Sequence, residues 1–256
     1  MGVVLAFCAA HAVWADEITI NPSQDNTLYE AATEKSNGAG DFFFSGHTAE
    51  ANTNVNRRGL IEFDVASAVP AGSRIDSVTL TLYMSRAVNA IGAKPFTLYD
   101  VTDSWGEGTA NAPGNEGGGT AAAGNDATWH FRFFSTTPWT TIGGDFNNTP
   151  LAETDVFSIN FYTWGSTDGM VASVQSWLDN PTANFGWILI GDEFTQESAA
   201  RFNTRQNVDS STWPVLDIQY TLAEDLPPPP PTVPEPGSLV MITLAGAAIL
   251  MRRGRK

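Results

Sequence analysis

The chain has 256 residues, of which 42% are hydrophobic and 16% are charged, with 13 Lys and Arg against 28 Asp and Glu. The length suits one large domain, and the formal net charge of −15 repels polyanions, so nucleic acid is not expected as a partner. Residues 16–226 alone hold 9 basic and 27 acidic residues, a net charge of −18.

Residues 1–15 have the features of a secretory signal peptide. An apolar run from residue 3 closes on the small residues Val13 and Ala15, so cleavage is expected after Ala15. The alternative is a buried N-terminal strand or helix. Cys8, the only cysteine, lies in this segment, so we expect the exported chain to have no disulfide, no Cys-ligated zinc and no cysteine nucleophile.

Residues 16–225 alternate apolar and polar side chains with a period of two, which is typical of half-buried β-strands. The clearest run turns four apolar residues to one face: Val78, Leu80, Leu82 and Met84. A second run places Ile61, Phe63 and Val65 inward. The expected strands are residues 41–45, 59–65, 74–86, 96–101, 128–134, 156–163, 185–191, 199–205 and 215–222.

Two stretches of the body depart from this pattern. In residues 169–180 the apolar side chains recur at helical spacing until Pro181, which predicts a short helix over the strands. Residues 106–127 are rich in Gly and Ala, and we interpret them as a long mobile surface loop. The predicted fold is therefore all-β, a two-sheet β-sandwich with jelly-roll-like connections and one short helix.

The body also resembles a known family, the DNRLRE domain, which is related to carbohydrate-binding modules. The segments that carry the resemblance are NRRGLIEFD (56–64), VPAGS (69–73), VTLTLY (78–83), SWGEGT (104–109), VQSW (174–177), NFGW (184–187), RFNTR (201–205) and PVL (214–216). The resemblance implies a jelly-roll fold, secretion and glycan binding, without a catalytic site.

The last part of the chain has three successive segments. Residues 226–236 form a proline-rich linker that should extend as polyproline II. Residues 237–251 are uncharged and would measure about 22 Å as a helix, short of a hydrocarbon core of roughly 30 Å. The basic tail that follows favours a membrane-inserted helix with the body outside.

The order of these segments resembles the PEP-CTERM sorting signal. The motif residues are Pro234, Glu235 and Pro236, and residues 237–256 hold the apolar helix and the basic tail with its Arg cluster. The resemblance implies recognition by an exosortase of a Gram-negative bacterium that makes exopolysaccharide. Cleavage near the motif would then deliver the protein to the cell envelope or extracellular matrix. A plain C-terminal anchor is the alternative, with the same topology and no cleavage.

Aromatic and basic side chains supply the candidate ligand-binding residues. Trp105, Trp139 and Trp164 lie in or beside predicted loops, where an indole could stack on a sugar ring. Trp129 and Trp187 alternate with other apolar residues and are predicted to be core. A second candidate is a basic island that could bind a carboxylated or sulfated sugar, formed by Arg58, Arg201 and Arg205. The alternative is that these arginines pair with nearby acids.

Oxygen-rich turns could hold a structural calcium ion, and no other cofactor is expected. The candidate ligands are Asp25, Asp41, Asp100 and Asp103.

Catalytic signatures are scarce. The body has two histidines, His47 and His130, and no HExxH, GxSxG or P-loop motif. A carboxylate pair could still serve glycoside cleavage, because the separation of two acids in space cannot be read from their spacing in the sequence. The loop acids available for it are Glu107, Asp126, Asp192 and Glu193, which we interpret as solvated charges. We therefore expect an exported, non-enzymatic envelope or matrix protein with exopolysaccharide as a partner. The alternatives are a polysaccharide-degrading enzyme and a self-assembling adhesin or surface-layer protein.

Overall fold

The computed structural model describes residues 15–31, 33–48, 55–87 and 92–226. The predicted signal segment and the predicted C-terminal apolar helix lie outside these ranges. The chain divides into one unit, Met1–Asp225, and a second, Leu226–Lys256.

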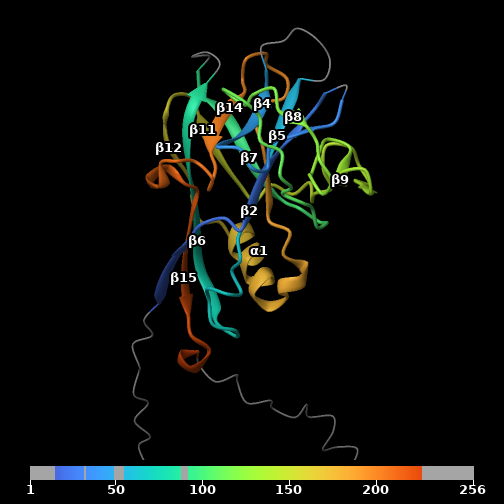
Figure 1. Cartoon of the computed structure of the whole chain (residues 1–256). Coiled ribbons are helices and arrows are strands. Elements are labelled where there is room, and N and C mark those ends of the chain that lie inside the picture. Colours follow the sequence, from blue (N-terminus) through green and yellow to red (C-terminus); the bar gives the residue numbers. More distant parts are fainter. Residues whose placement is uncertain (1–14, 32, 49–54, 88–91, 227–256) are drawn as a thin grey trace, which may run out of the picture. The chain divides into compact units, whose positions relative to one another are not determined.

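The described part of the first unit consists of strands with one α-helix (Figure 1). The strands are β1 (Asp16–Ile20), β2 (Gln24–Tyr29), β3 (Lys35–Ser36), β4 (Phe42–His47), β5 (Asn56–Glu62), β6 (Arg74–Ala87), β7 (Lys94–Asp100), β8 (Thr120–Ala121), β9 (Phe131–Phe133), β10 (Thr137–Pro138), β11 (Ala152–Val156), β12 (Asn160–Trp164), β13 (Trp187–Ile190), β14 (Ala200–Asn203) and β15 (Val215–Thr221). The helices are α1 (Asp168–Asp179) and the 3-10 turns η1 (Pro181–Ala183), η2 (Ser210–Thr212) and η3 (Ala223–Asp225).

Eleven strands form one curled antiparallel sheet, in the order β1-β15-β6-β14-β4-β5-β13-β7-β11, with β12 on β6 and β2 on β5. Strand β4 joins the two halves of this sheet, because its first residues pair with β14 while Gly46 and His47 pair with β5. Gly46 has φ +103, and a Cβ there would lie 2.9 Å from the carbonyl oxygen of Ser198. The change of partner therefore requires glycine.

The all-β prediction is confirmed. One continuous hydrogen-bonded path joins nine strands, and β12 and β2 are attached to it, so this pairing does not by itself establish two separate sheets. The two-sheet jelly-roll stays a prediction.

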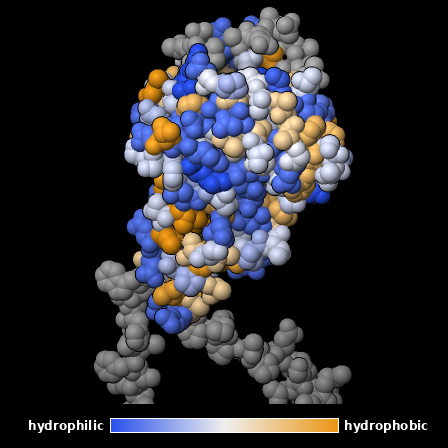
Figure 2. All heavy atoms as spheres, in the orientation of Figure 1, coloured by the Kyte–Doolittle hydropathy of each residue, from blue (hydrophilic) through white to orange (hydrophobic). Residues whose placement is uncertain are grey.

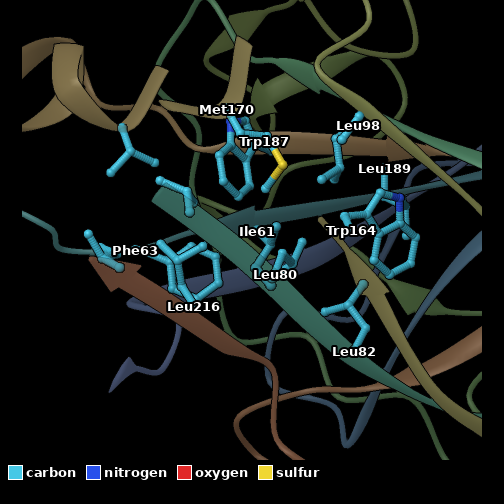
Figure 3. Packing of buried hydrophobic residues seen from close by; sticks show 14 of the residues in the cluster. Ile61, Phe63, Leu80, Leu82, Leu98, Trp164, Met170, Trp187, Leu189 and Leu216 are labelled. Carbon is cyan, nitrogen blue, oxygen red and sulfur yellow. The ribbon is translucent and has the colours of Figure 1, made fainter. Parts of the chain in front are cut away.

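Both halves of the curled sheet turn one face to a common hydrophobic core (Figure 3). One half contributes Leu80, Leu82 and Leu216, and the other contributes Ile61, Leu98, Trp187 and Leu189. The alternation predicted for β6 is confirmed, since its four inward residues are at most 1% exposed.

The central strands are buried on their outer face as well. Ile188 lies between the core residues Trp187 and Leu189, yet it belongs to a second cluster with Leu28 and Leu60. That cluster is completed by residues from the segment between β7 and β11: Val101, Trp105, Ala127, Trp129 and Trp139. This segment therefore covers β2, β5 and β13.

Helix α1 begins where the sequence predicts. The Thr167 hydroxyl accepts a hydrogen bond from the backbone N–H of Met170, which caps the first turn, and the helix ends before Pro181. Its buried stripe includes Val174 and Trp177. Gln175 fixes the helix to the start of β6 by accepting a hydrogen bond from the backbone N–H of Ile75 (2.8 Å).

Three strand predictions were wrong in extent. The strand predicted at 59–65 is β5, which begins at Asn56 and ends at Glu62. Residues 156–163 form the end of β11 and most of β12, separated by a turn. The Tyr162 hydroxyl fixes this turn, since it accepts hydrogen bonds from the N–H groups of Phe157 (3.2 Å) and Ser158 (2.9 Å). Of residues 128–134 only β9 is a strand, and it pairs only with β10 within the described ranges.

Phe202 provides a test of the common core. Its ring stacks on Phe43 at 5.4 Å between centroids and meets Phe96 edge-on at 5.7 Å, with no exposed surface. We expect Phe202→Ala to lower the free energy of unfolding by about 3–5 kcal/mol, because it leaves a cavity between the two halves. Denaturant unfolding measures this loss. The control is Phe194→Ala, whose side chain is 97% exposed and should change stability by less than about 0.5 kcal/mol; equal effects of both substitutions would contradict the packing described.

Candidate functional site

The three tryptophans predicted as sugar platforms are buried. Trp105 and Trp139 are 3% and 4% exposed in the second cluster, and Trp164 is 0% exposed in the common core. Each indole N–H donates to a backbone carbonyl: that of Phe185 for Trp105 (2.9 Å), Thr128 for Trp139 (2.9 Å) and Phe96 for Trp164 (2.7 Å). The prediction was wrong because the loops that carry Trp105 and Trp139 cover the sheet, and Trp164 lies within β12. Trp129 and Trp187 are core residues, as predicted.

The Gly- and Ala-rich loop at 106–127 is held in place, in contrast to the mobile loop predicted. Buried Asp126 accepts hydrogen bonds from the backbone N–H groups of Thr109 and Ala123, both at 2.7 Å. The Glu116 carboxylate accepts from the side chain of Asn37 (2.7 Å) and the N–H of Phe42 (3.0 Å). Two acidic side chains therefore fasten the loop, where apolar residues are too few to do so.

Arg58 is a structural residue of the covering segment. Its guanidinium forms a two-pronged ion pair with Glu193 at 2.7 and 2.9 Å and donates to the Gly143 carbonyl at 2.8 Å. It also lies 4.8 Å from the ring centre of Trp129. The alternative given in the sequence analysis, that these arginines pair with nearby acids, is therefore confirmed for Arg58.

Arg205 also pairs with an acid. Its guanidinium contacts the Glu107 carboxylate at 2.5 Å, and the other oxygen of Glu107 accepts from the backbone N–H of Asp25 (3.0 Å) and from Gln206 (3.1 Å). The predicted basic island of Arg58, Arg201 and Arg205 is therefore wrong, because Arg58 and Arg205 form ion pairs with Glu193 and Glu107.

Arg201 instead lines a surface pocket with two arginines that the sequence analysis did not select, Arg57 and Arg86. Its Nε donates to the Ser85 hydroxyl at 3.0 Å, and its guanidinium lies 3.7 Å from the ring centre of Phe42. The sequence analysis selected Arg58 in place of its neighbour Arg57. Adjacent residues of a strand point to opposite faces of the sheet, so choosing the arginine that faces the pocket requires the register of β5. The end of a strand is where register is hardest to read from sequence.

The four aspartates predicted as calcium ligands do not form one site. Asp25 is buried against Glu107 and Arg205, Asp100 accepts a hydrogen bond from the Ser173 hydroxyl, and Asp103 lies 4.0 Å from Arg132. Asp41 is held through its backbone, whose N–H donates to Glu116. Within the described ranges, no three His, Cys, Asp or Glu side chains are grouped so as to hold a metal ion.

Asp25 has the most perturbed acidity of these groups. Complete burial raises its pKa from 3.8 to about 8, the negative charge of Glu107 adds to this rise, and a hydrogen bond from the backbone of Arg205 opposes it. One of its carboxyl oxygens has no hydrogen-bond partner among the described residues. The raised pKa favours the protonated form of the Asp25 side chain at neutral pH.

The remaining loop acids serve as structural contacts. Glu107 and Glu193 form the ion pairs described above, and Asp126 accepts backbone hydrogen bonds. Burial opposes ionisation of Asp192, but hydrogen bonds from Thr195, Lys94 and Phe194 outweigh it and lower its pKa. His130 contacts Glu34 at 2.7 Å, with 42% of its side chain exposed.

Comparison with protein families identifies the end of the chain. The family model described as "PEP-CTERM protein-sorting motif" matches residues 232–256. The chain carries a PEP-CTERM sorting motif. This confirms the resemblance of Pro234, Glu235 and Pro236 with the segment that follows, and it indicates an exosortase substrate exported to the cell envelope. No curated protein matches the chain.

The motif lies beyond the described residues. Among those residues, no helix has the length and apolar character needed to cross a membrane.

Asp25 gives a prediction about pH dependence. Between pH values of about 4 and 8 the folded chain keeps a proton on Asp25 that the unfolded chain has released, so stability falls as the pH rises through this window. For one proton the slope is at most about 1.4 kcal/mol per pH unit. Asp25→Asn cannot ionise, so its stability relative to the unsubstituted chain should increase from pH 5 to pH 9 in denaturant unfolding. Asp155→Asn, at an exposed position of β11, is the control and should leave the slope unchanged; parallel curves for Asp25→Asn and the unsubstituted chain would refute the role of Asp25.

Proposed function

We propose that this protein is an exported, non-enzymatic component of the cell envelope or exopolysaccharide matrix of a Gram-negative bacterium. In this proposal an exosortase cleaves the chain near its PEP-CTERM motif, and the β-rich body contacts exopolysaccharide outside the cell. The single observation that carries the proposal is the match of the sorting motif to residues 232–256.

The proposed route begins with a signal peptide cleaved after Ala15. The predicted apolar helix after the motif holds the chain in the membrane until processing. The segments between the two sorting signals then remain outside as one β-rich body, which we take to be a DNRLRE-like jelly-roll with two sheets and a weak affinity for glycan.

The contacts of the acidic residues support a non-enzymatic role. General acid and base catalysis requires a carboxyl group that reaches substrate and changes its protonation during the reaction. Glu107, Asp126 and Glu193 are instead bonded to arginines or backbone N–H groups of the domain itself. A polysaccharide-degrading enzyme is therefore the weaker candidate, and polymer hydrolysis that is lost in Glu107→Gln would favour it.

Exposed apolar side chains favour a second candidate, a self-assembling adhesin or surface-layer protein. Phe157 and Ile159 lie in the turn between β11 and β12, and Phe161 lies in β12, with exposed fractions of 53%, 61% and 48%. Figure 2 shows hydrophobic residues in small separate groups on the visible face, among hydrophilic ones. Oligomers whose size rises with protein concentration in light scattering would support self-assembly through such groups.

Processing at the motif is tested by mass spectrometry of the exported protein. We expect a C-terminus close to Pro236 in the unsubstituted chain and an intact Lys256 after Glu235→Ala, because the substitution removes the charged residue of the motif. Glu224→Ala, in η3 and outside the matched residues, should be processed normally. An intact Lys256 in the unsubstituted exported chain would contradict exosortase cleavage.

Binding is tested separately, by cosedimentation of the exported protein with exopolysaccharide purified from the producing bacterium. Retention in the pellet supports glycan contact. A protein that stays in the supernatant at all protein concentrations would leave only the role of a matrix component that binds no polymer.

A further inference from the structure

Two arginines face each other across neighbouring strands at one end of the sheet. Strands β6, β14 and β4 lie side by side, and Arg201 of β14 is the direct partner of Arg86 on one side and of Phe44 on the other. Like charges placed directly opposite on neighbouring strands repel and destabilise a sheet. The pair is unfavourable for folding alone, so its presence suggests a function.

The same arginines line a pocket of about 200 Å³, together with a third arginine of β5. The lining residues are Phe44, Thr48, Arg57, Arg86, Asn115, Gly117, Ala199 and Arg201. Taking roughly 30 Å³ for each water molecule in the liquid, the pocket has room for about six or seven waters, which suits a small charged group and part of the ring that carries it.

The arginines on the two sides of the pocket are held in place. Arg57 donates to the carbonyl oxygens of Asn56 (2.8 Å) and Glu30 (3.3 Å), and its guanidinium lies 5.0 Å from the ring centre of Tyr29. Arg201 is held by Ser85 and the ring of Phe42. Because little side-chain freedom is left to lose at these positions, an anion could be bound with a small entropic cost.

Positive charge is concentrated here in an otherwise acidic body. Three of the nine basic residues of positions 16–226 line this pocket, while five of the other six form ion pairs with carboxylates. Among the described residues, Arg86 and Arg201 have no ion-pair partner, and no Asp or Glu lines the pocket. Burial, and then the charge of Arg86, lower the pKa of Arg201, while the negative charge of Glu116 opposes this shift. A bound anion would stabilise the charged form of Arg201 in the same way as Glu116 does.

We propose that the pocket of Arg57, Arg86 and Arg201 binds the carboxylate group of an acidic polysaccharide. The inference rests on the proposed contact with exopolysaccharide and names its chemistry as a polymer that contains uronic acid. A planar guanidinium forms two parallel charge-assisted hydrogen bonds with a carboxylate, and these are stronger than its hydrogen bonds to the uncharged hydroxyl groups of a neutral sugar.

The other lining residues suit the rest of the sugar. The ring of Phe44 offers an apolar surface for the C–H face of a pyranose, and Thr48 and Asn115 offer hydrogen bonds to hydroxyl groups. The net charge of −18 does not prevent binding, since at physiological salt charges further apart than about 8 Å are largely screened. The three arginines are the charged residues that line the pocket, and Glu116 acts on Arg201 as an opposing charge.

Isothermal titration of the full chain with an oligogalacturonate tests the proposal. We expect Arg86→Gln and Arg201→Gln each to weaken binding at least tenfold, and a neutral cello-oligosaccharide to bind far more weakly than the oligogalacturonate to the unsubstituted chain. The matched control is Arg74→Gln. Arg74 lies at the opposite end of β6 from Arg86, its side chain is 54% exposed, and it forms an ion pair with Asp76. It should bind as the unsubstituted chain does.

Thermal unfolding separates loss of the site from loss of the fold. Arg86→Gln removes a like-charge repulsion, so its midpoint should not fall below that of the unsubstituted chain.

Each other outcome overturns the inference in a distinct way. Equal binding by Arg86→Gln and the unsubstituted chain, or preference for the neutral oligosaccharide, would overturn the pocket assignment and leave glycan binding intact. Preference for dextran sulfate over oligogalacturonate would overturn the choice of carboxylate. No binding to any of these probes would overturn the inference, while cosedimentation with the native exopolysaccharide would still decide the proposed function.

Discussion

The structure depends on covering the central strands of a curled sheet on both faces. Strand β13 has apolar side chains on each side, so a single core leaves Ile188 and its neighbours exposed. The segment between β7 and β11 meets this need by placing Trp105, Trp129 and Trp139 on the outer face. Burial of these indoles fixes the path of a segment that contains little regular structure.

Hydrogen bonds of buried polar side chains hold the loops that have few apolar residues. Asn26, buried in β2, donates to the carbonyl oxygen of Glu107 (2.9 Å) and accepts from the N–H of Asn37 (3.1 Å), so it joins two loops to the sheet. Buried polar groups are costly unless they are bonded, and their loss would leave unpaired partners. Asp126 and Glu116 hold loops in the same way, through hydrogen bonds from backbone N–H groups and from Asn37.

The sequence predicted the strands with clear alternation, but not the polar ones. Alternation of Val78 to Met84 places β6 correctly, and the stripe from Val174 to Trp177 places α1. Strand β2 (QDNTLY) is largely polar in sequence and almost wholly buried, and its polar residues form hydrogen bonds with distant parts of the chain. Its burial follows from partners such as Glu107, more than 80 positions away, and no local pattern contains them.

The sequence predicted an arginine cluster of Arg58, Arg201 and Arg205, which the structure does not form. Arg201 instead lines a pocket with Arg57 and Arg86, and the binding of an acidic sugar there is a proposal. Whether a charged side chain finds an acid nearby depends on which loops lie beside it, as for Arg58 and Glu193. The tryptophans failed for a related reason, because glycine around an indole says nothing about what the loop will cover.

The pairing of β1 with β15 has a consequence for assembly. Asp16 is the partner of Tyr220, so the first strand of the body finds its place only when the last strand is available. A contact across some 200 positions is slow to form, since the whole intervening chain must close into a loop. During export to the envelope, β1 therefore stays unpaired until β15 has emerged. The negative charges of Asp16 and Glu17 in β1 oppose its association with a neighbouring copy of the chain during that time.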